Sequence, residues 1–211
     1  MTHRVIRKIV IPGPKDNCSM DRVAIFGSAD ITKEDPLYKE VFECTKYLAQ
    51  NKKVVVDGGG PGVMLAATEG AKSAGGKVVT VTFQPQDMPE FEGQDKENIS
   101  DVEIKTTNYV ERMFGLMEEA DAIICFKGGT GTLSEWSTAW LLAHLHYGNH
   151  KPIILYGEFW NDLLKVVVDN FFIGEKELSI YKVVTNQEEM IQALKEFEKD
   201  LAQRCSLPAR E

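Results

Sequence analysis

The sequence lacks an excess of positive charge, a long hydrophobic run and paired cysteine motifs. Its 24 Lys and Arg residues, against 32 Asp and Glu residues, give a formal net charge of −8. A broad surface for nucleic acid or for an anionic membrane needs a basic patch, so we expect neither partner. No stretch approaches the roughly 18 apolar residues of a membrane-spanning helix. These absences predict a cytoplasmic protein, and they leave room for a small anionic ligand held by backbone N–H groups.

Metal-site and disulfide patterns are also missing. The four cysteines, Cys18, Cys44, Cys125 and Cys205, show neither CxxC spacing nor zinc-finger partners. We expect free thiols in a reducing compartment. The histidines of residues 144–150 form no HExxH motif and have no carboxylate at metal-ligand spacing. The sequence therefore indicates no metal and no other cofactor.

Two glycine-rich runs are present, but neither has a familiar nucleotide-binding pattern. GGGPG at 58–62 and GGTGT at 128–132 are not followed by the Gly-Lys-Ser/Thr of a Walker A motif. Neither has the GxGxxG spacing of a dinucleotide site. Binding of ATP or NAD by the usual devices is not indicated.

Short β-rich runs alternate with longer segments of helical period along the whole chain. We expect strands at residues 23–27, 53–57, 77–83, 102–106, 122–126, 152–156 and 181–184. We expect helices at residues 36–50, 63–74, 109–119, 133–146, 159–170 and 188–202. Near-continuous apolar strands such as VVV and AIIC fit a sheet covered on both faces. The pattern predicts an α/β protein of Rossmann type, with a doubly wound, mostly parallel sheet.

No break in composition divides the chain, so we predict one domain over residues 1–211. Its core spans about residues 20–202, between a short N-terminal extension and a C-terminal tail. The polar residues 84–100 are expected to form a long loop, and such loops are often functional.

The glycine-rich runs follow predicted strands, where ligands bind in parallel sheets. Glycine permits a tight turn and a close approach of a ligand. The helix that follows supplies unpaired N–H groups and the positive end of its dipole. The hydroxyl groups of Thr130 and Thr132 add two donors. Taken alone, one run would be only a strand-to-helix turn; two runs in one sheet favour a phosphate site.

GGTGTLSE at 128–135 resembles the GGxGTxxE signature of the Lonely Guy (LOG) family. GGGPGVMLAATEGA at 58–71 is similar to the family's second glycine motif, VAIFGSA at 23–29 to its first strand and turn, and KPIILYGEFW at 151–160 to the segment after the signature helix. The resemblance covers about residues 20–170. It implies a Rossmann fold, a homodimer and the activity of a cytokinin riboside 5′-monophosphate phosphoribohydrolase. An older label of the family, lysine decarboxylase, finds no lysine context for pyridoxal phosphate here.

The resemblance also assigns candidate site residues. Arg112 and Glu135 match the family's catalytic arginine and glutamate, at its usual separation of 23 residues. The residues expected to hold the 5′-phosphate are Gly128, Gly129, Thr130, Gly131 and Thr132. Gly59, Gly60 and Met64 are expected to line the nucleotide pocket, with Ser28 at its edge. Arg112 could contact the phosphate or ribose, or form an ion pair that positions Glu135; the sequence leaves both roles open.

Two residues depart from the family pattern. Met113 stands where the family usually has lysine, and Lys127 stands where the signature usually opens with proline. Two functions therefore remain open. The first is hydrolysis of the N-glycosidic bond of a purine nucleoside 5′-monophosphate, N6-modified adenine included, to free base and ribose 5-phosphate. The second is a non-catalytic binding or carrier protein for a nucleotide or the molybdenum cofactor.

Overall fold

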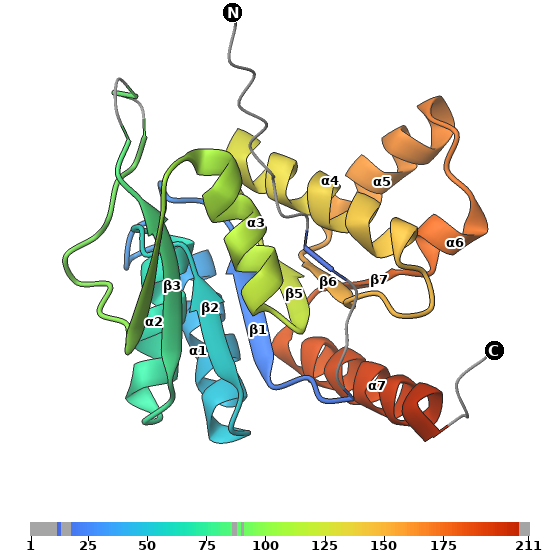
Figure 1. Ribbon diagram of the computed structural model, residues 1–211, viewed down its shortest axis with the longest axis horizontal. Coiled ribbons are helices and arrows are strands. Elements are labelled where there is room, and N and C mark those ends of the chain that lie inside the picture. Colours follow the sequence, from blue (N-terminus) through green and yellow to red (C-terminus); the bar gives the residue numbers. More distant parts are fainter. Residues whose placement is uncertain (1–11, 14–17, 86–87, 90, 207–211) are drawn as a thin grey trace, which may run out of the picture.

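The computed structural model describes residues 12–13, 18–85, 88–89 and 91–206. In these residues seven strands alternate with helices (Figure 1). The strands are β1 (Arg22–Phe26), β2 (Val54–Asp57), β3 (Val78–Phe83), β4 (Val102–Thr106), β5 (Ala122–Cys125), β6 (Ile153–Tyr156) and β7 (Tyr181–Val184). The helices are α1 (Pro36–Gln50), α2 (Val63–Ser73), α3 (Tyr109–Glu119), α4 (Thr130–Leu145), α5 (Phe159–Asn170), α6 (Glu175–Leu178) and α7 (Gln187–Ser206). Most of the predicted N-terminal extension and C-terminal tail lies outside the described residues.

The strands form one sheet in the order β4-β3-β2-β1-β5-β6-β7, and every neighbouring pair is parallel. The predicted doubly wound, parallel α/β fold is therefore confirmed. The chain runs from β1 towards one edge of the sheet and then returns to place β5 on the other side of β1. Phe26 pairs with Cys125, so the turns that follow β1 and β5 lie side by side. Such a switch point is where open parallel sheets bind their ligands.

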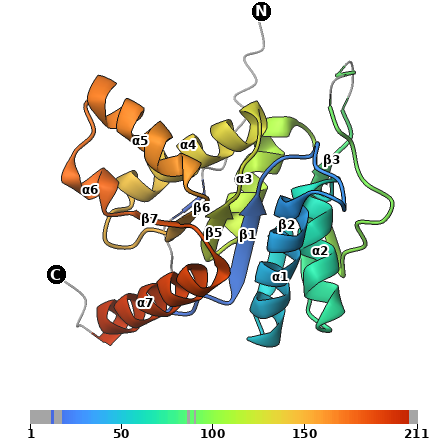
Figure 2. The same ribbon diagram turned by 180° about the vertical axis from the view of Figure 1, so that it is seen from behind.

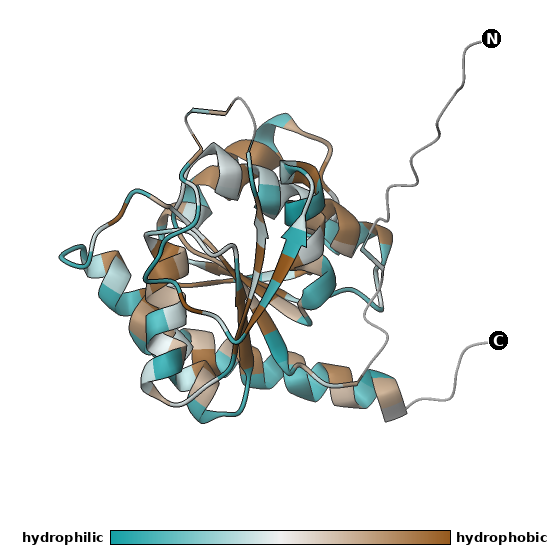
Figure 3. Ribbon diagram, turned by 60° about the vertical axis from the view of Figure 1, so that its left-hand side comes forward, coloured by the Kyte–Doolittle hydropathy of each residue, from teal (hydrophilic) through white to brown (hydrophobic). Residues whose placement is uncertain are grey.

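Helices cover both faces of the sheet. Helices α1, α2 and α7 bury Val41, Ala66 and Met190 against one face, which Figure 2 shows in front. Helices α3, α4 and α5 cover the other face. All six residues of β3 are buried, because side chains on both sides of the strand meet a helix layer. Figure 3 shows the hydrophobic strands running through the middle of this arrangement.

The helices differ from the sequence prediction mainly at α4, α6 and α7. Helix α4 begins at Thr130, three residues earlier than expected, with Gly129 as its N-cap. Glycine and threonine are weak helix formers, so the periodic pattern concealed a first turn that tertiary packing stabilises. The one-turn helix α6 is too short to give a periodic signal, and α7 continues to Ser206 rather than ending at residue 202.

The cysteines do not all remain free. Cys18 and Cys205 form a disulfide, so the expectation of four free thiols is wrong for this pair. Cys44 and Cys125 are free and buried. The disulfide joins the segment before β1 to the end of α7, across a sequence separation of 187 residues. The tertiary fold brings these two segments together, and the spacing of cysteines in the sequence carries no trace of that contact.

No helix in the described part of the chain combines the length and the apolar character that crossing a membrane requires.

Candidate functional site

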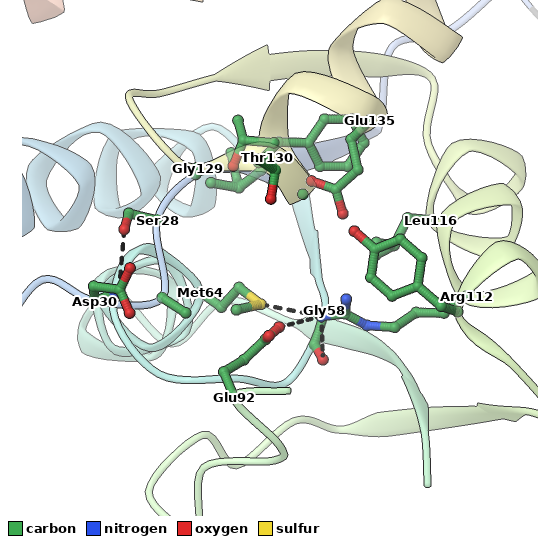
Figure 4. Close-up of a pocket in the computed structure, with 17 residues that line it drawn as sticks. Ser28, Asp30, Gly58, Met64, Glu92, Arg112, Leu116, Gly129, Thr130 and Glu135 are labelled. Atoms are coloured by element: carbon green, nitrogen blue, oxygen red, sulfur yellow. Dashed lines mark hydrogen bonds and ion pairs between the residues drawn. The ribbon is translucent and has the colours of Figure 1, made fainter. Parts of the chain in front are cut away.

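A cavity of about 220 Å³ opens at the carboxyl ends of β1 and β5 (Figure 4). Its wall comes from the turn after β1, the turn after β2, the loop of residues 84–100, helix α3 and the first turn of α4. The predicted site residues in this wall are Ser28, Met64, Arg112, Gly129, Thr130, Gly131, Thr132 and Glu135. The structure therefore brings most of them into one pocket.

Three predicted residues lie outside this wall. Gly128 is exposed just before α4, and a Cβ atom there would stand 2.1 Å from the Thr132 hydroxyl oxygen. Gly59 lines a different, more polar cavity together with Thr80 and Glu103. Gly60 contributes its carbonyl oxygen as acceptor for the Asn98 side chain. These glycines shape the turns that carry the pocket.

The first turn of α4 supplies hydrogen-bond donors to the pocket. The first helical bond runs from the Leu133 N–H group to the Gly129 carbonyl oxygen, so the N–H groups of Thr130, Gly131 and Thr132 precede the helical ladder. Gly129 is the N-cap and has no side chain to bond them. Because the positive end of the helix dipole adds to these donors, this turn suits an anion such as a phosphate group.

Glu135 stands one turn further along α4, and its side chain points into the pocket (Figure 4). The residue is 7% exposed, and none of the described residues donates a hydrogen bond to its carboxylate. Burial raises the pKa of Glu135 to about 7; the charge of Arg112 lowers it, and that of Glu92 raises it further. A carboxyl group with this pKa can exchange a proton at neutral pH.

Arg112 is held rigidly on α3. The helix starts with Asn108, whose side chain accepts the Glu111 N–H group. One turn later, the Arg112 guanidinium donates from Nε to the Val81 carbonyl oxygen at 3.2 Å and from Nη2 to the Gly58 carbonyl oxygen at 3.1 Å. Arg112 is 3% exposed, so these inward bonds replace the water that a charged group would otherwise keep.

Arg112 requires glycine at position 58. A Cβ atom there would stand 1.9 Å from Nη2 of Arg112 and 2.8 Å from the Met64 sulfur. Because these neighbours are packed closely, no larger residue fits without displacing the guanidinium. The first glycine of the GGGPG run thus sets the place of a charged group in the pocket.

Arg112 and Glu135 do not form an ion pair. The carboxylate nearest to the guanidinium is that of Glu92, whose Oε1 lies 3.7 Å from Nη2. Figure 4 shows Glu135 and Glu92 on opposite sides of the pocket, with Arg112 entering between them. An Arg112–Glu135 ion pair, one of the two roles that the sequence left open, is absent from the described residues. The proximity of Arg112 still acts on Glu135, by lowering its pKa.

Asp57, at the end of β2, holds the GGGPG turn in place. Its buried carboxylate accepts the Gly59 N–H group at 2.7 Å, the Thr68 hydroxyl at 2.8 Å and the Asn98 amide at 3.1 Å. Burial raises the pKa of Asp57 to about 6, while its hydrogen bonds and Arg112 lower it. Asp57 therefore ties the turn after β2 to the loop of residues 84–100.

The two departures from the family pattern have different surroundings. Met113 is buried in the core between α3 and the sheet, and its sulfur lies 3.7 Å from the Ser134 hydroxyl oxygen. Lys127 is exposed, and its ammonium lies 5.9 Å from the centre of the Phe159 ring. Neither side chain lines the pocket. Arg112 is consequently the one cationic side chain among the described residues of the pocket wall.

The sequence motifs did not single out several polar side chains of the site, although two of them come from the loop of residues 84–100 and the start of α3, where the sequence led us to expect one end of the pocket. Asp30, Glu92 and Tyr109 line the pocket, and a Cβ atom on Gly131 would stand 3.0 Å from the Tyr109 hydroxyl. Tyr109 begins α3 one turn before Arg112, so it lies on the same side of the helix, and this spacing could have indicated a pocket residue. The buried strand VVVD ends in an ionisable residue, which is a usable signal for Asp57. Glu92 lies in a polar loop with other carboxylates, and nothing in the sequence separates it from them.

Residues 20–193 match the model of the SLOG cluster4 family. An uncharacterised protein of Archaeoglobus fulgidus is 29% identical over 118 residues, which are 56% of this chain and 72% of that protein. Among solved structures, TM1055 aligns with a TM-score of 0.64 and 26% identity, over 84% of this chain and 99% of that one. The molybdenum cofactor binding protein from Rippkaea orientalis aligns with a TM-score of 0.61 and 22% identity, over 85% and 98%.

The family model covers most of the chain, including both glycine-rich turns, Arg112 and Glu135. The likeness to the Rippkaea orientalis protein concerns the fold, and the likeness to TM1055 extends over nearly the whole of that chain. The resemblance to LOG-type proteins that the motifs indicated is confirmed at the level of the superfamily, and the chain belongs to the SLOG cluster4 family.

Proposed function

We propose that the protein is a nucleoside 5′-monophosphate phosphoribohydrolase, which releases a purine base and ribose 5-phosphate. The observation that carries this proposal is the surroundings of Glu135. Its buried carboxyl group has a pKa raised to about 7, receives no hydrogen bond from the described residues, and faces a pocket that begins at an uncapped helix N-terminus. An anion site next to a group that can exchange a proton is what such a reaction requires.

The proposed reaction uses two parts of α4, its first turn and Glu135. The 5′-phosphate accepts the N–H groups of Thr130, Gly131 and Thr132, and this anchor places the ribose against Glu135. The C1′–N bond breaks as positive charge develops at C1′, which the carboxylate stabilises. The oxygen of a water molecule bonds to C1′ and gives a proton to Glu135. The base leaves with the electron pair of the broken bond and takes up the proton that Glu135 received from water, so Glu135 returns to its ionised form and the atoms and charges balance.

Arg112 acts in this account through its position rather than as a phosphate ligand. Its Nε and Nη2 atoms already donate to carbonyl oxygens of the protein, so the guanidinium is fixed at the floor of the pocket. From there its charge lowers the pKa of Glu135, against the effect of burial. We infer that Arg112 keeps a useful fraction of Glu135 ionised at neutral pH.

An assay of free base released from a panel of nucleoside 5′-monophosphates, N6-modified adenine nucleotides included, tests the proposal. The matching nucleosides serve as controls for the anchor role of the phosphate. We expect adenine from AMP and little from adenosine. Equal rates with both would remove the proposed role of the α4 turn, and no release from any member would contradict hydrolysis.

A second candidate is a non-catalytic carrier or binding protein for a nucleotide or the molybdenum cofactor. The departures of Met113 and Lys127 from the family pattern support it, and Arg112 is the single cationic side chain among the described residues of the pocket wall. The similarity of the fold to that of a molybdenum cofactor binding protein also supports this candidate. Purified protein that carries a pterin phosphate and hydrolyses no nucleotide would favour this candidate. Protein free of pterin that turns over AMP would exclude it.

We propose a homodimer as the assembly. The exposed apolar side chains of Leu141 and Leu145 on α4, and of Phe171 and Phe172 after α5, support an interface that includes α4 or the segment after α5. Light scattering on the wild type and on Leu141→Glu tests it: a dimer mass for the first and a monomer mass for the second are expected. A monomeric wild type would contradict it.

The predicted absence of nucleic-acid binding follows from the net charge of −8 and is tested by a gel shift with single-stranded DNA, where no shift is expected. A cytoplasmic location stays a prediction from the sequence.

A further inference from the structure

Glu92 is held at the mouth of the pocket by its neighbours in the loop of residues 84–100. The ring of Phe91 packs on that of Phe83, with centroids 4.5 Å apart, and lies 5.6 Å from the Arg112 guanidinium. Further along the loop, the Asp95 N–H group donates to the Gly59 carbonyl oxygen at 2.9 Å. These contacts on both sides hold the backbone at Glu92 next to the pocket, and its side chain lines the pocket wall.

The acceptor capacity of Glu92 is unused within the described chain. Its Oε1 lies 3.7 Å from Nη2 of Arg112, which is an ion pair but longer than a hydrogen bond. That nitrogen already donates to the Gly58 carbonyl oxygen. None of the described residues donates a hydrogen bond to Glu92, and its side chain is 28% exposed. Both carboxylate oxygens can therefore accept hydrogen bonds from a ligand.

The two ends of the pocket differ in hydrogen-bonding character: one end offers donors and the other offers acceptors. Gly129 and Thr130 mark the end that offers N–H donors, whereas Glu92 lies across the pocket and offers only acceptors (Figure 4). The charge of Glu92 opposes an anion at its own end. A ligand fits this arrangement when it has an anionic group at one end and hydrogen-bond donors at the other.

We propose that Glu92 is a specificity-determining residue, which accepts hydrogen bonds from donor groups of the bound nucleotide. The donors are the ribose hydroxyl groups or the exocyclic amine of the base, and a carboxylate accepts from either. This inference rests on the proposed binding of a nucleoside 5′-monophosphate. Hydrogen bonds to Glu92 would explain why the pocket prefers a ligand with donor groups. They would also orient the ligand so that its phosphate meets α4.

Titration calorimetry in the Glu135→Gln background, which limits turnover, tests the proposal. AMP is compared with 2′-deoxy-AMP and 3′-deoxy-AMP, which each lack one hydroxyl, and with IMP, which lacks the amine. Glu92→Ala is expected to weaken AMP binding about tenfold or more, because it removes charge-assisted hydrogen bonds. If an analogue lacks the group that donates to Glu92, Glu92→Ala should weaken its binding much less than it weakens that of AMP. The analogue that behaves in this way therefore identifies the donor group. Glu92→Gln keeps one carbonyl acceptor and should lose less than Glu92→Ala.

Glu97→Ala is the matched control, because Glu97 belongs to the same loop but pairs with Lys33 outside the pocket. It should leave all four affinities unchanged. Equal losses for the four nucleotides in Glu92→Ala, or tighter binding of all four, would overturn the proposal. If the native protein still releases base in that case, the proposed function stands and only the role of Glu92 falls. If none of the four binds, the proposed function and this inference fall together.

Discussion

Arg112 and Glu135 line the same pocket from two different helices without forming an ion pair. The guanidinium is bonded to carbonyl oxygens of the turn after β2 and of β3, and the nearest carboxylate belongs to Glu92. Glu135 consequently keeps a carboxyl group whose pKa is raised to about 7 by burial. The separation of the two residues leaves the Glu135 carboxyl group available to a ligand.

Glu135 should make the folded protein less stable as the pH rises. Its pKa is raised from 4.5 to about 7, so the folded state binds a proton more tightly than the unfolded state. Stability is therefore lost between pH values of about 4.5 and 7. Glu135→Gln should remove this loss and exceed the wild type by about 2–3 kcal/mol in unfolding free energy above neutral pH. Urea unfolding of both proteins at acid and at mildly alkaline pH measures it.

The buried Asp57, whose pKa is also raised, titrates in both proteins and cancels from this comparison. A Glu135→Gln protein that gains no stability relative to the wild type as the pH rises would show that Glu135 is not held in the protonated form.

Glu92→Gln should shift the pH dependence of base release. The charge of Glu92 raises the pKa of Glu135, so its removal lowers that pKa. Since the ionised Glu135 receives the proton of water, the acid limb of the rate profile should move to lower pH. Glu97→Gln, outside the pocket, should leave the profile in place. A shift to higher pH with Glu92→Gln would contradict the assigned roles.

Gly58→Ala should damage the site through Arg112. The new methyl group would stand 1.9 Å from Nη2, so the guanidinium must move or the turn must shift. We expect a loss of about 1–3 kcal/mol in stability from overpacking, and a fall in base release of about a hundredfold from misplacement. Thermal unfolding and the base-release assay measure the two effects.

Gly13→Ala is the control for this substitution, because no heavy atom lies within 4 Å of a Cβ atom at that position. Full activity of Gly58→Ala would show that the position of Arg112 is unimportant to the reaction.

The Cys18–Cys205 disulfide should stabilise the fold against unfolding. It closes a loop with a sequence separation of 187 residues, for which the chain-entropy model gives about 5 kcal/mol. Cys205→Ser should therefore melt at a lower temperature than the oxidised wild type. Under a strong reductant the two proteins should melt together, since Cys44 and Cys125 are already free. A difference that persists in the reductant would assign the effect to packing of the cysteine side chain.

The sequence was sufficient for the sheet, and most of the site residues that it predicted line one pocket. Apolar strands, helical period and glycine turns each have a local signal, and β1 to β7 follow them closely. The start of α4 at Thr130 had no such signal, because its weak helix formers are stabilised by packing of the turn around Thr132.

Contacts between distant segments were beyond the sequence. The ion pair of Glu92 with Arg112 and the disulfide of Cys18 with Cys205 both join residues whose neighbourhood the tertiary fold creates. The choice of Gly58 rather than Gly59 or Gly60 as a wall of the pocket depends on the path of one turn, held by Asp57.

The most direct test of the account is the rate of adenine release from AMP by the wild type and by Glu135→Gln. Glu118→Gln is the control, since it removes an equally charged but exposed carboxylate of α3. The account predicts release by the wild type and the control, and a loss of about a hundredfold or more in Glu135→Gln with AMP still bound. Unchanged release by Glu135→Gln, or a wild type that binds AMP and releases no base, would contradict it.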